Sequence, residues 1–399
     1  MTNKQNDIMT FLRDYDKLGG VETPFWYYDM DLLRKTVDKA AELAEKYDIG
    51  LHYAIKANIE PPILRYISSK GIGADCVSGN EVVYAAEHGF KPETIVYAGV
   101  GKTDKEIRKA LELGIEAFNC ESIMEMKVIA GLAKEMGCKA NISVRINPDI
   151  DAHTHKYIST GMQENKFGIS KHEFDEVITL LQSAESLEFA GLHFHVGSQI
   201  MDVDEVFSLE CERAADTVDY FEAKGLKVRS IDLGGGLGVD YENPDLSPMP
   251  DFEAWFSTIA SKLRSRPDQR VSVEPGRSLV AQCGSLMTRV LFVKEGESKI
   301  FLIMDAGMND LIRPALYGAY HKVENVTAMA EGSSQDMRKY DVVGPVCESS
   351  DVWGTDRVLP CSKRGDLMAI RTAGAYGSVM SSRYNLRDLA LSYFSENFD

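Results

Sequence analysis

One lysine, Lys56, stands near the end of the apolar run Leu51–Ala57. The alternation of Leu51, Tyr53 and Ile55 within this run predicts a buried strand. Burial of an ammonium without a partner is costly, so such a lysine tends toward its neutral form, which is the nucleophile that condenses with an aldehyde. A lysine at a strand end can also extend its charge to water, and position alone leaves both interpretations open.

A glycine-rich stretch, Asp232–Gly238, follows another apolar strand. Glycines allow backbone N–H groups to approach a phosphate closely, and the start of a helix adds a favourable dipole. The stretch does not match the dinucleotide-binding pattern, because Val239 stands where the third glycine belongs. It is compatible with a phosphate-binding turn and equally with a simple tight turn between a strand and a helix.

A histidine pair lies in the segment Gly191–Gln199. Strict alternation places His193 and His195 on one face of a predicted strand. Such a pair could bind a metal ion, but no third ligand with a suitable spacing is evident, so we predict no metal site. One imidazole could instead lie flat against a planar ring, and Gly197 and Ser198 could help to bind an anion.

Two segments carry candidate acid–base groups. Glu274 ends a strand and could hold a proton on a heterocyclic nitrogen, or it could simply pair with Arg277. Cys347 lies beside Glu348 and Asp351, and a thiol next to carboxylates suits a proton donor better than a nucleophile. The alternative for Cys347 is a buried, inert cysteine.

Two further segments supply groups suited to anions. Arg313 and Tyr317 belong to one of them, and Tyr376 belongs to the other. Arginine binds carboxylates and phosphates through charge-assisted, often bidentate hydrogen bonds. We therefore expect these residues to contact a carboxylate or a phosphate.

The elements that must position these groups alternate between short apolar strands and helices. The eight predicted strands are Leu51–Ala57, Gly73–Val77, Thr94–Ala98, Glu116–Cys120, Ile142–Asn147, Phe189–Val196, Ser230–Gly234 and Val271–Glu274. Alternation of this kind predicts a parallel sheet, and eight units predict a β/α barrel with its active site at the C-terminal ends of the strands. Five unusual residues fall at such ends: Lys56, Asp75, His195, Gly234 and Glu274.

After Arg277 the pattern changes to strands separated by turns. The segments concerned are Val290–Val293, Ile300–Met304, Val323–Thr327, Tyr340–Val343, Arg357–Leu359 and Leu367–Arg371. They predict an all-β domain, which the N-terminal strand Phe25–Tyr28 is expected to join because the barrel is complete without it. We therefore expect a barrel domain over residues 30–275 and a β domain formed by residues 1–29 and 276–399.

Composition excludes several classes of protein. The 399 residues include 44 Lys and Arg against 61 Asp and Glu, which gives a formal net charge of −17. Such a charge argues against nucleic acid and anionic membranes as partners. No apolar run is long enough for a membrane span, and the N-terminus does not resemble a signal peptide. The seven cysteines include no C-x-x-C pair, so we predict a cytoplasmic protein without a disulfide framework.

Taken together, the motifs resemble the barrel-type, pyridoxal-phosphate-dependent decarboxylases of basic amino acids, and among these most closely the diaminopimelate decarboxylase family. The resemblance covers nearly the whole chain in the right order. The segments that carry it are Tyr53–Asn58, Ser159–Gly168, His193–Gln199, Glu274–Arg277, Arg313–Tyr317, Cys347–Asp351 and Gly374–Tyr376. It implies a pyridoxal-phosphate-binding (β/α)8 barrel followed by a C-terminal all-β domain.

The resemblance also implies pyridoxal 5'-phosphate (PLP) as the cofactor. Lys56 would bond covalently to its aldehyde, His195 would stack on its ring, and Glu274 would pair with the ring nitrogen and keep the ring an electron sink. The remaining residues of the implied cofactor site, most of them at the phosphate, are Asp75, Ser198, Gly235, Gly236, Gly276, Arg277 and Tyr376.

The implied reaction converts meso-2,6-diaminopimelate to L-lysine and carbon dioxide. Substrate-binding residues would be Arg277, Arg313, Tyr317 and Tyr376, with Glu348 at the distal ammonium. Cys347 would protonate the carbanion after carbon dioxide has left. In this family Cys347 and Glu348 reach the active site of the other subunit, so a homodimer with shared sites is expected.

Other functions remain open at this point. A related decarboxylase of ornithine, arginine or carboxynorspermidine would share the scaffold but would meet a different distal group. A racemase would need two opposed acid–base groups. A non-catalytic PLP-binding homologue would not need both Lys56 and Cys347.

Overall fold

The computed structural model describes residues 10–148, 166–333 and 335–398, which divide into two compact units. The first, which we call the barrel unit, combines Val37–Gly238 with Asp251–Gly276 as far as they are described. The second, the strand-rich unit, combines the described residues before Val37 with Val239–Pro250 and the residues after Gly276.

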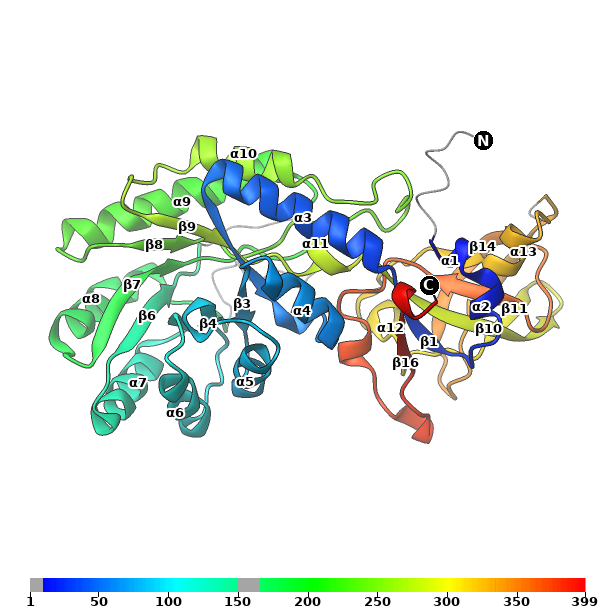
Figure 1. Cartoon of the computed structure of the whole chain (residues 1–399), viewed down its shortest axis with the longest axis horizontal. Helices are drawn as coiled ribbons and strands as arrows, with labels where there is room; N and C mark the ends of the chain where they lie inside the picture. Colours follow the sequence, from blue (N-terminus) through cyan, green and yellow to red (C-terminus); the bar gives the residue numbers. More distant parts are fainter. Residues whose placement is uncertain (1–9, 149–165, 334, 399) are drawn as a thin grey trace. The chain divides into compact units, whose positions relative to one another are not determined.

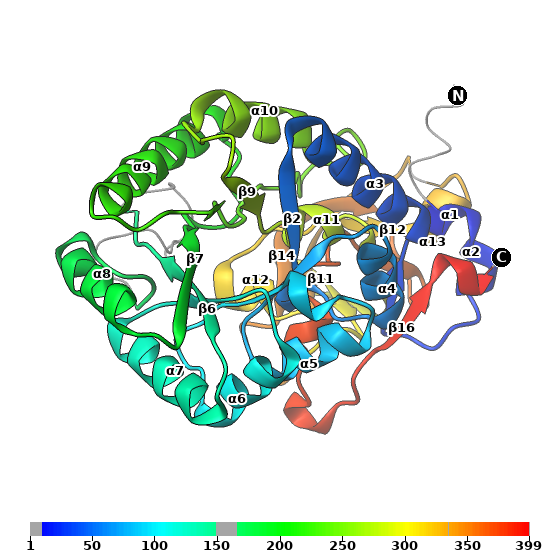
Figure 2. The same ribbon diagram turned by 60° about the vertical axis from the view of Figure 1, so that its left-hand side comes forward.

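The barrel unit contains the predicted closed barrel of parallel strands, each paired with the next in sequence order and the last with the first (Figure 2). Its strands are β2 (Ile49–Ala54), β3 (Gly73–Cys76), β4 (Ile95–Tyr97), β5 (Ala117–Cys120), β6 (Ala140–Arg145), β7 (Leu187–His193), β8 (Ser230–Asp232) and β9 (Arg270–Val273). The parallel pairing brings the C-terminal ends of all these strands to one rim of the barrel, which is where active sites form in this architecture.

Helices follow the strands and surround them (Figures 1 and 2). They are α3 (Met30–Tyr47), α4 (Pro61–Ser69), α5 (Gly79–Glu87), α6 (Asp104–Leu113), α7 (Ile123–Met136), α8 (Phe174–Ser183), α9 (Val203–Ala223) and α10 (Phe252–Lys262). Helix α6 illustrates the local signals. Thr103 and Glu106 form a reciprocal capping box at its start, and Gly114, at φ 66°, ends it in the left-handed conformation.

Most of the predicted barrel strands end earlier than expected, and the two largest differences, at β2 and β7, concern candidate residues. Strand β2 stops at Ala54, and Lys56 lies in a short 3-10 turn, η1 (Ile55–Ala57), closed by a hydrogen bond from Asn58 N–H to the Ile55 carbonyl. Strand β7 stops at His193, so the prediction that both histidines share one strand face is wrong. His195 lies beyond the strand, where Gly197 at φ 150° and Gln199 at φ 63° turn the chain.

The strand-rich unit contains one sheet in the order β12-β15-β10-β11-β13-β14, with β1 and β16 attached through β10. Its strands are β1 (Phe25–Tyr28), β10 (Gly284–Glu295), β11 (Ile300–Met304), β12 (Val323–Asn325), β13 (Met337–Val343), β14 (Val352–Pro360), β15 (Leu367–Ile370) and β16 (Leu391–Phe394). Strand β1 pairs antiparallel with β10, which confirms that the N-terminal strand joins this sheet. The sequence analysis missed β16, whose outward Leu391 is largely exposed and gives no clear alternation.

Short helices complete the unit, and part of its core lies under β1. The helices are α1 (Thr10–Arg13), α2 (Tyr15–Leu18), α11 (Arg277–Val280), α12 (Arg313–Tyr317) and α13 (Val326–Ala330). Buried Leu18, Phe25, Tyr27, Met287 and Phe398 pack together, so residues far apart in the sequence hold the sheet in one piece.

Residues 239–250, which directly follow the glycine-rich stretch, group with the strand-rich unit. Asp245 receives Lys322 at 3.1 Å and Arg371 at 2.9 Å, and these cations hold the pKa of the Asp245 carboxyl below its usual value although burial opposes them. These ion pairs explain why the segment belongs to the strand-rich unit. No periodic pattern in the sequence predicts this assignment.

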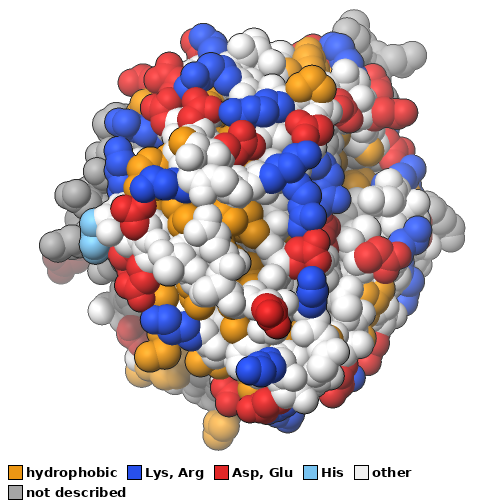
Figure 3. All heavy atoms as spheres, turned by 90° about the vertical axis from the view of Figure 1, so that its left-hand side faces the viewer, with side chains coloured by type: hydrophobic (Ala, Val, Ile, Leu, Met, Phe, Trp, Pro, Cys, Tyr) orange, Lys and Arg blue, Asp and Glu red, His pale blue; other side chains and the backbone are white. Residues whose placement is uncertain are grey.

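The surface carries mixed charge. Figure 3 shows one face on which acidic and basic side chains are interspersed around smaller apolar areas. Among the described helices, none is long and apolar enough to cross a membrane. Mixed charge of this kind gives no single-sign field over that face for a polyanion to bind.

Candidate active site

Lys56 meets a carboxylate at the C-terminal rim of the barrel. Its Nζ lies 3.2 Å from Asp75 Oδ2, and Asp75 ends the neighbouring strand β3. The Lys56 side chain is 38% exposed, whereas Asp75 is buried. The lysine is therefore paired and partly accessible, rather than buried alone as its strand position suggested. Asp75 Oδ1 is buried without a hydrogen-bond partner among the described residues, so the rim holds polar capacity for another group.

Glu274 follows β9 on the same rim and accepts two hydrogen bonds. Asn119 Nδ2 lies 3.4 Å from its Oε1, and His193 Nε2 lies 3.2 Å from its Oε2. Burial raises the pKa of Glu274, and the nearby Asp75 carboxylate acts in the same direction. A buried carboxylate with two donors is oriented rather than free to rotate, as a partner for a ring nitrogen must be.

His195 offers a neutral ring at this rim. The Gly235 N–H donates to its Nδ1 at 3.2 Å, which assigns the ring proton to Nε2. Burial lowers the pKa of His195 well below its usual value, and the positive charges of Arg145 and Lys56 lower it further. An uncharged imidazole that is only half-buried presents a flat face suited to stacking on a planar ring.

The glycines of the triplet are required by geometry. A Cβ on Gly235 would lie 2.3 Å from the Glu274 carbonyl oxygen, and one on Gly236 would lie 2.7 Å from Ile200. Gly234 and Gly236 also adopt positive φ angles of 65° and 126°. Only glycine fits these positions, and a glycine turn of this kind suits a phosphate. Gly197, at φ 150°, and half-buried Ser198 lie in the neighbouring turn.

The predicted cofactor fits these residues. PLP needs an amine for its aldehyde, a flat neighbour, an acceptor for its ring nitrogen and a phosphate cradle. Lys56, His195, Glu274 and the Gly235–Gly236 backbone supply these four features within one unit. Gly276 packs closely against the end of β2, because a Cβ added to it would lie 3.0 Å from the Ala54 Cβ.

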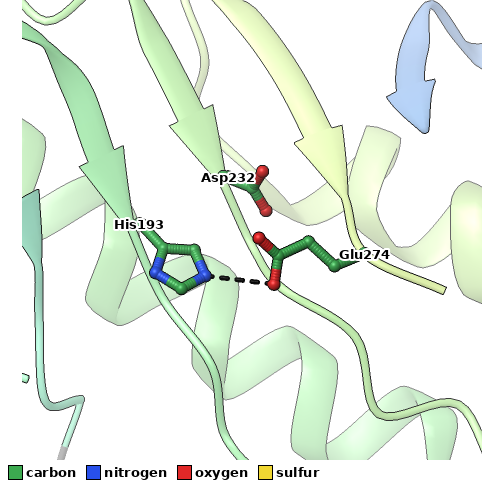
Figure 4. A group of neighbouring side chains, drawn as sticks. All are labelled: His193, Asp232 and Glu274. Carbon is green, nitrogen blue, oxygen red and sulfur yellow. Dashed lines mark hydrogen bonds and ion pairs between the residues drawn. The ribbon is translucent and has the colours of Figure 1, made fainter. Parts of the chain in front are cut away.

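Glu274 belongs to a group of three buried side chains. One ligand atom each of His193, Asp232 and Glu274 lies within 4.8 Å of the others (Figure 4). A metal ion could be held at such a spacing, but the Asp232 oxygens already accept from Gly234 N–H and Ser272 Oγ, and Glu274 already accepts from His193 and Asn119. The group is thus hydrogen-bonded within the protein.

An arginine–tyrosine cluster lies in the strand-rich unit. Arg277 Nη1 donates to the Tyr241 hydroxyl at 2.5 Å, and Arg313 lies over the Tyr241 ring at 5.0 Å. Arg277 also lies 5.1 Å from the Tyr376 ring centre. Burial raises the pKa of Tyr241, but the two guanidinium groups outweigh it and lower that pKa overall. The structure thus brings together three residues predicted from the sequence with one, Tyr241, that was missed.

Arg313 has a second buried partner that sequence reasoning also missed. Its Nη1 lies 2.9 Å from Nε2 of His321, whose Nδ1 lies 2.9 Å from the Arg371 carbonyl. Burial and the Arg313 charge lower the pKa of His321 to about 3, so the ring accepts from Arg313 in its neutral form. Tyr317, at the end of α12, is half-buried in the same unit.

The Cys347–Glu348 segment is exposed. The Cys347 side chain is exposed, so the alternative of a buried, inert cysteine is wrong. The Cys347 N–H donates to Asn385 Oδ1 at 3.1 Å. Glu348 accepts from Ser350 Oγ at 2.7 Å and from the Tyr384 hydroxyl at 2.9 Å, and these bonds lower the pKa of Glu348. Neither residue belongs to the barrel unit.

Arg145 and Glu121 form a buried pair that the sequence analysis did not single out. Arg145 Nη1 lies 2.8 Å from Glu121 Oε1, and Glu121 also accepts from Gly99 N–H and Gly168 N–H. Arg145 ends β6 and Glu121 directly follows β5, and this position at a strand end is the signal that could have found them. Part of the predicted segment Ser159–Gly168, namely residues 159–165, lies outside the described residues.

Comparison with known proteins covers nearly the whole chain. Residues 31–281 match the family model for "Pyridoxal-dependent decarboxylase, pyridoxal binding domain". The chain is 50% identical over 382 residues to diaminopimelate decarboxylase from Bacteroides thetaiotaomicron, with 96% of this chain and 97% of the relative covered. It is similar to the crystal structure of diaminopimelate decarboxylase from Helicobacter pylori complexed with L-lysine, at a TM-score of 0.88 and 41% identity, covering 95% of this chain and 93% of that one. A diaminopimelate decarboxylase structure from M. jannaschii in co-complex with L-lysine has a TM-score of 0.84 at 32% identity, covering 96% and 89%.

Proposed function

Because the chain belongs to the diaminopimelate decarboxylase family of pyridoxal-dependent decarboxylases, we propose that it converts meso-2,6-diaminopimelate to L-lysine and carbon dioxide. The observation that carries this proposal is the pair of buried guanidinium groups of Arg277 and Arg313 around the Tyr241 hydroxyl. Buried guanidinium groups suit a planar carboxylate, and diaminopimelate keeps one carboxylate at the end that does not react.

The barrel residues would bind PLP, which when bound supplies an electron sink for the bond that breaks. Lys56 would bond to its aldehyde carbon, with Asp75 beside the amine. The neutral ring of His195 would lie against the cofactor ring, and Glu274 would accept a hydrogen bond from the ring nitrogen. The backbone N–H groups around Gly235, with Ser198, Gly236, Gly276 and Tyr376, would bind the phosphate.

The other residues would select and protonate the substrate. Arg277, Arg313 and Tyr317 would fix the distal carboxylate, and Glu348 would receive the distal ammonium. The bond between the α-carbon and the reacting carboxylate breaks, and carbon dioxide leaves. Cys347 would then donate its thiol proton to the same α-carbon, so that one carbon–carbon bond is replaced by one carbon–hydrogen bond.

The experiment is a comparison of carbon dioxide release from meso-diaminopimelate, L-lysine, L-ornithine and L-arginine. A substrate without the distal carboxylate leaves buried guanidinium groups without their ligand, so its kcat/KM should fall by roughly a thousandfold or more. Arg313→Ala should reduce kcat/KM for diaminopimelate selectively. Comparable kcat/KM for ornithine or arginine would overturn the proposed substrate and favour a related decarboxylase.

We further propose a homodimer in which Cys347 and Glu348 complete the partner's active site. Both residues are exposed, and the neighbouring segment carries apolar side chains on the surface, with Tyr384 45% and Leu386 94% exposed. Exposed apolar groups beside chemically active ones are typical of an interface. A two-fold dimer would make two equivalent sites.

Complementation tests this arrangement. Lys56→Ala and Cys347→Ala proteins are each expected to be inactive, and a mixed dimer should contain one site with both substitutions and one with neither. Part of the wild-type activity should therefore return after subunit exchange. Exchange without return of activity would mean that each site is built from one chain.

A cytoplasmic location is proposed on composition, because the cysteines form no framework pattern and the net charge is −17. Cell fractionation tests it, with activity expected in the cytosolic fraction.

A further inference from the structure

The interior of this barrel is polar. Barrels of this type are usually filled with layers of branched apolar side chains. Buried polar side chains on or next to the barrel strands are His52, Asp75, Asn119, Ser143, His193, Asp232, Ser272 and Glu274. Buried charge is retained only where it is paired, and pairing within a barrel costs more than apolar packing of the same volume. This interior therefore calls for a functional reason.

Acids and bases alternate along that interior. At the N-terminal ends of the strands, Arg270 pairs with Glu116, and Glu116 Oε2 lies 3.0 Å from Nε2 of His52. Nδ1 of His52 lies 3.6 Å from Asp232 Oδ2. A cavity of about 540 Å³ reaches Arg270, Glu116, His52 and Asp232 from that end of the barrel.

The same series continues to the C-terminal rim. His193 and Asp232 both lie beside Glu274, with the Nε2 of His193 3.2 Å from Glu274 Oε2 (Figure 4). Asp232 is fixed in turn by Gly234 N–H at 2.8 Å and Ser272 Oγ at 2.9 Å. His52 thus separates two carboxylates, whereas His193 donates to one of two carboxylates, Asp232 and Glu274, that face each other and would repel one another if both were charged (Figure 4).

We propose that His193 is a positioning residue for Glu274: its Nε2–H holds the Glu274 carboxylate ionised and aimed at the ring nitrogen of the cofactor, and Asp232, backed by His52, keeps that proton on His193. The inference rests on the proposed function only through the contact of Glu274 with the ring nitrogen. His193 itself is not required to touch the cofactor or the substrate.

The charges around His193 agree with this role. Burial lowers the pKa of His193, but Glu274 and Asp232 outweigh it and raise that pKa overall, against an opposing effect of Arg145 on β6. His52 lies between Asp232 and Glu116, and these carboxylates outweigh burial and raise its pKa to about 10. A cationic His52 helps to hold the pKa of Asp232 at about 2, although burial opposes it.

Groups from the other packed elements set the opposing forces on Glu274. Asp75 on β3 and Asp232 on β8 raise its pKa, and the buried carboxyl of Glu210 on α9 interacts with the same acids. Without the hydrogen bond from His193, burial and these acids would all favour the protonated form of Glu274. A protonated Glu274 would keep a carbonyl oxygen that can accept a hydrogen bond, but it would have no negative charge to hold a proton on the ring nitrogen, so the donor on His193 favours the form that the cofactor requires.

The first test measures the proton on His193 directly. Full-length protein labelled with 15N-histidine would be examined by long-range nitrogen–proton NMR with PLP bound and after its removal. His193 signals are assigned by their loss in His193→Phe and His193→Gln. The proposal expects a proton on Nε2 across neutral pH and a displaced signal in Glu274→Gln. A wild-type Nε2 without a proton would overturn it, whether or not the enzyme turns over any substrate.

The second test measures what the cofactor experiences. With PLP labelled with 15N in the ring, wild type and His193→Gln should both show a ring N–H, because a glutamine amide can still donate to Glu274. His193→Phe should lose that signal or weaken PLP binding by roughly tenfold or more. The matched control is His172→Phe, at an exposed histidine on the short helix η3 (Lys171–Glu173), which should behave as wild type.

The outcomes separate this inference from the proposed function. A ring nitrogen and PLP affinity unchanged in His193→Phe would overturn the role of His193. If His193→Phe does not fold, the wild-type proton measurement and the His193→Gln spectrum still decide. Loss of diaminopimelate turnover with the ring N–H behaving as expected would instead remove the proposed substrate and leave the positioning role intact.

Discussion

The residues of the barrel rim and the Cys347–Glu348 segment differ in how they are held. At the rim, Glu274 is buried and accepts two hydrogen bonds, and Lys56 is paired with the buried Asp75. The Cys347–Glu348 segment is exposed, and its hydrogen bonds to Ser350, Tyr384 and Asn385 stay within the strand-rich unit. One region is therefore held by buried partners, and the other is exposed in the single chain.

The difference agrees with the roles that we propose for the two regions. Control of charge on a cofactor ring requires rigid, desolvated partners, because an electrostatic interaction weakens when water competes for it. A proton donor that acts on the substrate after bond cleavage can instead be brought in by a second surface. The comparison predicts that substitutions at the rim act on cofactor chemistry in any assembly state, whereas substitutions in the exposed segment act only through the dimer.

The largest effect is expected for Lys56→Ala. Loss of the amine removes the covalent bond to PLP, and kcat should fall by on the order of ten thousandfold or more. The visible absorbance of bound PLP that borohydride reduction abolishes should disappear as well. Lys105→Ala, at an exposed lysine on α6, is the matched control and should retain both properties. Wild-type turnover by Lys56→Ala would mean that another group binds the aldehyde.

A smaller effect is expected for Cys347→Ala. Removal of a proton donor should lower kcat by roughly a hundredfold to a thousandfold while PLP absorbance stays normal. The control is Cys361→Ala, because Cys361 is a second exposed free thiol in the same unit. Steady-state kinetics and absorbance on the same samples provide the measurement. An altered cofactor spectrum in Cys347→Ala would contradict the prediction that only substitutions at the rim change the state of the cofactor.

The sequence predicted the architecture because its signals are local and repeated. Strand and helix alternation revealed the barrel, and turn-separated strands revealed the second sheet, including the pairing of β1 with β10. The ends of β2 and β7 could not be predicted, because the apolar pattern continues past Ala54 and His193, where the two strands stop. Periodicity records which side chains are buried, not where the backbone leaves a sheet.

The site was predicted unevenly for a related reason. Lys56, His195 and Glu274 stand out as polar residues that interrupt apolar strands. Tyr241 and His321 lie in irregular segments whose composition carries no period, so their contacts with Arg277 and Arg313 emerge only from the folded chain. Partners that meet across long sequence separations leave no trace in local pattern.

The next prediction concerns Tyr241→Phe in the arginine–tyrosine cluster, which we compare with the rim and the Cys347–Glu348 segment. The substitution removes the hydroxyl that accepts from Arg277 but keeps the ring on which Arg313 packs. A net loss of about one hydrogen bond to a charged group should raise KM for diaminopimelate by roughly threefold to tenfold or slightly more, with little change in kcat. Tyr66→Phe, at a half-buried tyrosine of the barrel unit that donates to Asp38, is the control. A change in kcat alone would place Tyr241 in the chemical step instead.

The smallest effect on activity, and a clear one on stability, is expected for Glu210→Gln. Glu210 on α9 is as buried as Glu274, yet neither of its carboxyl oxygens has a hydrogen-bond partner among the described residues. Burial raises the pKa of Glu210 well above its usual value, and Asp232 and Glu274 raise it further. The folded protein therefore keeps this proton at pH values where the unfolded chain, with a pKa near ~4.3, has released it.

Stability lost in this way grows as the pH rises above the unfolded pKa, because the unfolded state binds fewer protons than the folded one. Glutamine does not ionise, so Glu210→Gln should gain thermal stability relative to wild type at pH 8 compared with pH 4, whatever the constant cost of its buried amide. Melting of the holoprotein at both pH values provides the measurement, and Glu212→Gln, at an exposed glutamate on the same helix, should show no such change. If the Tm of Glu210→Gln differs from that of wild type by the same amount at both pH values, then Glu210 ionises in the folded protein as it does in the unfolded chain. In that case hydrogen-bond donors such as those of Glu274 are not needed to keep a buried carboxylate charged in this barrel.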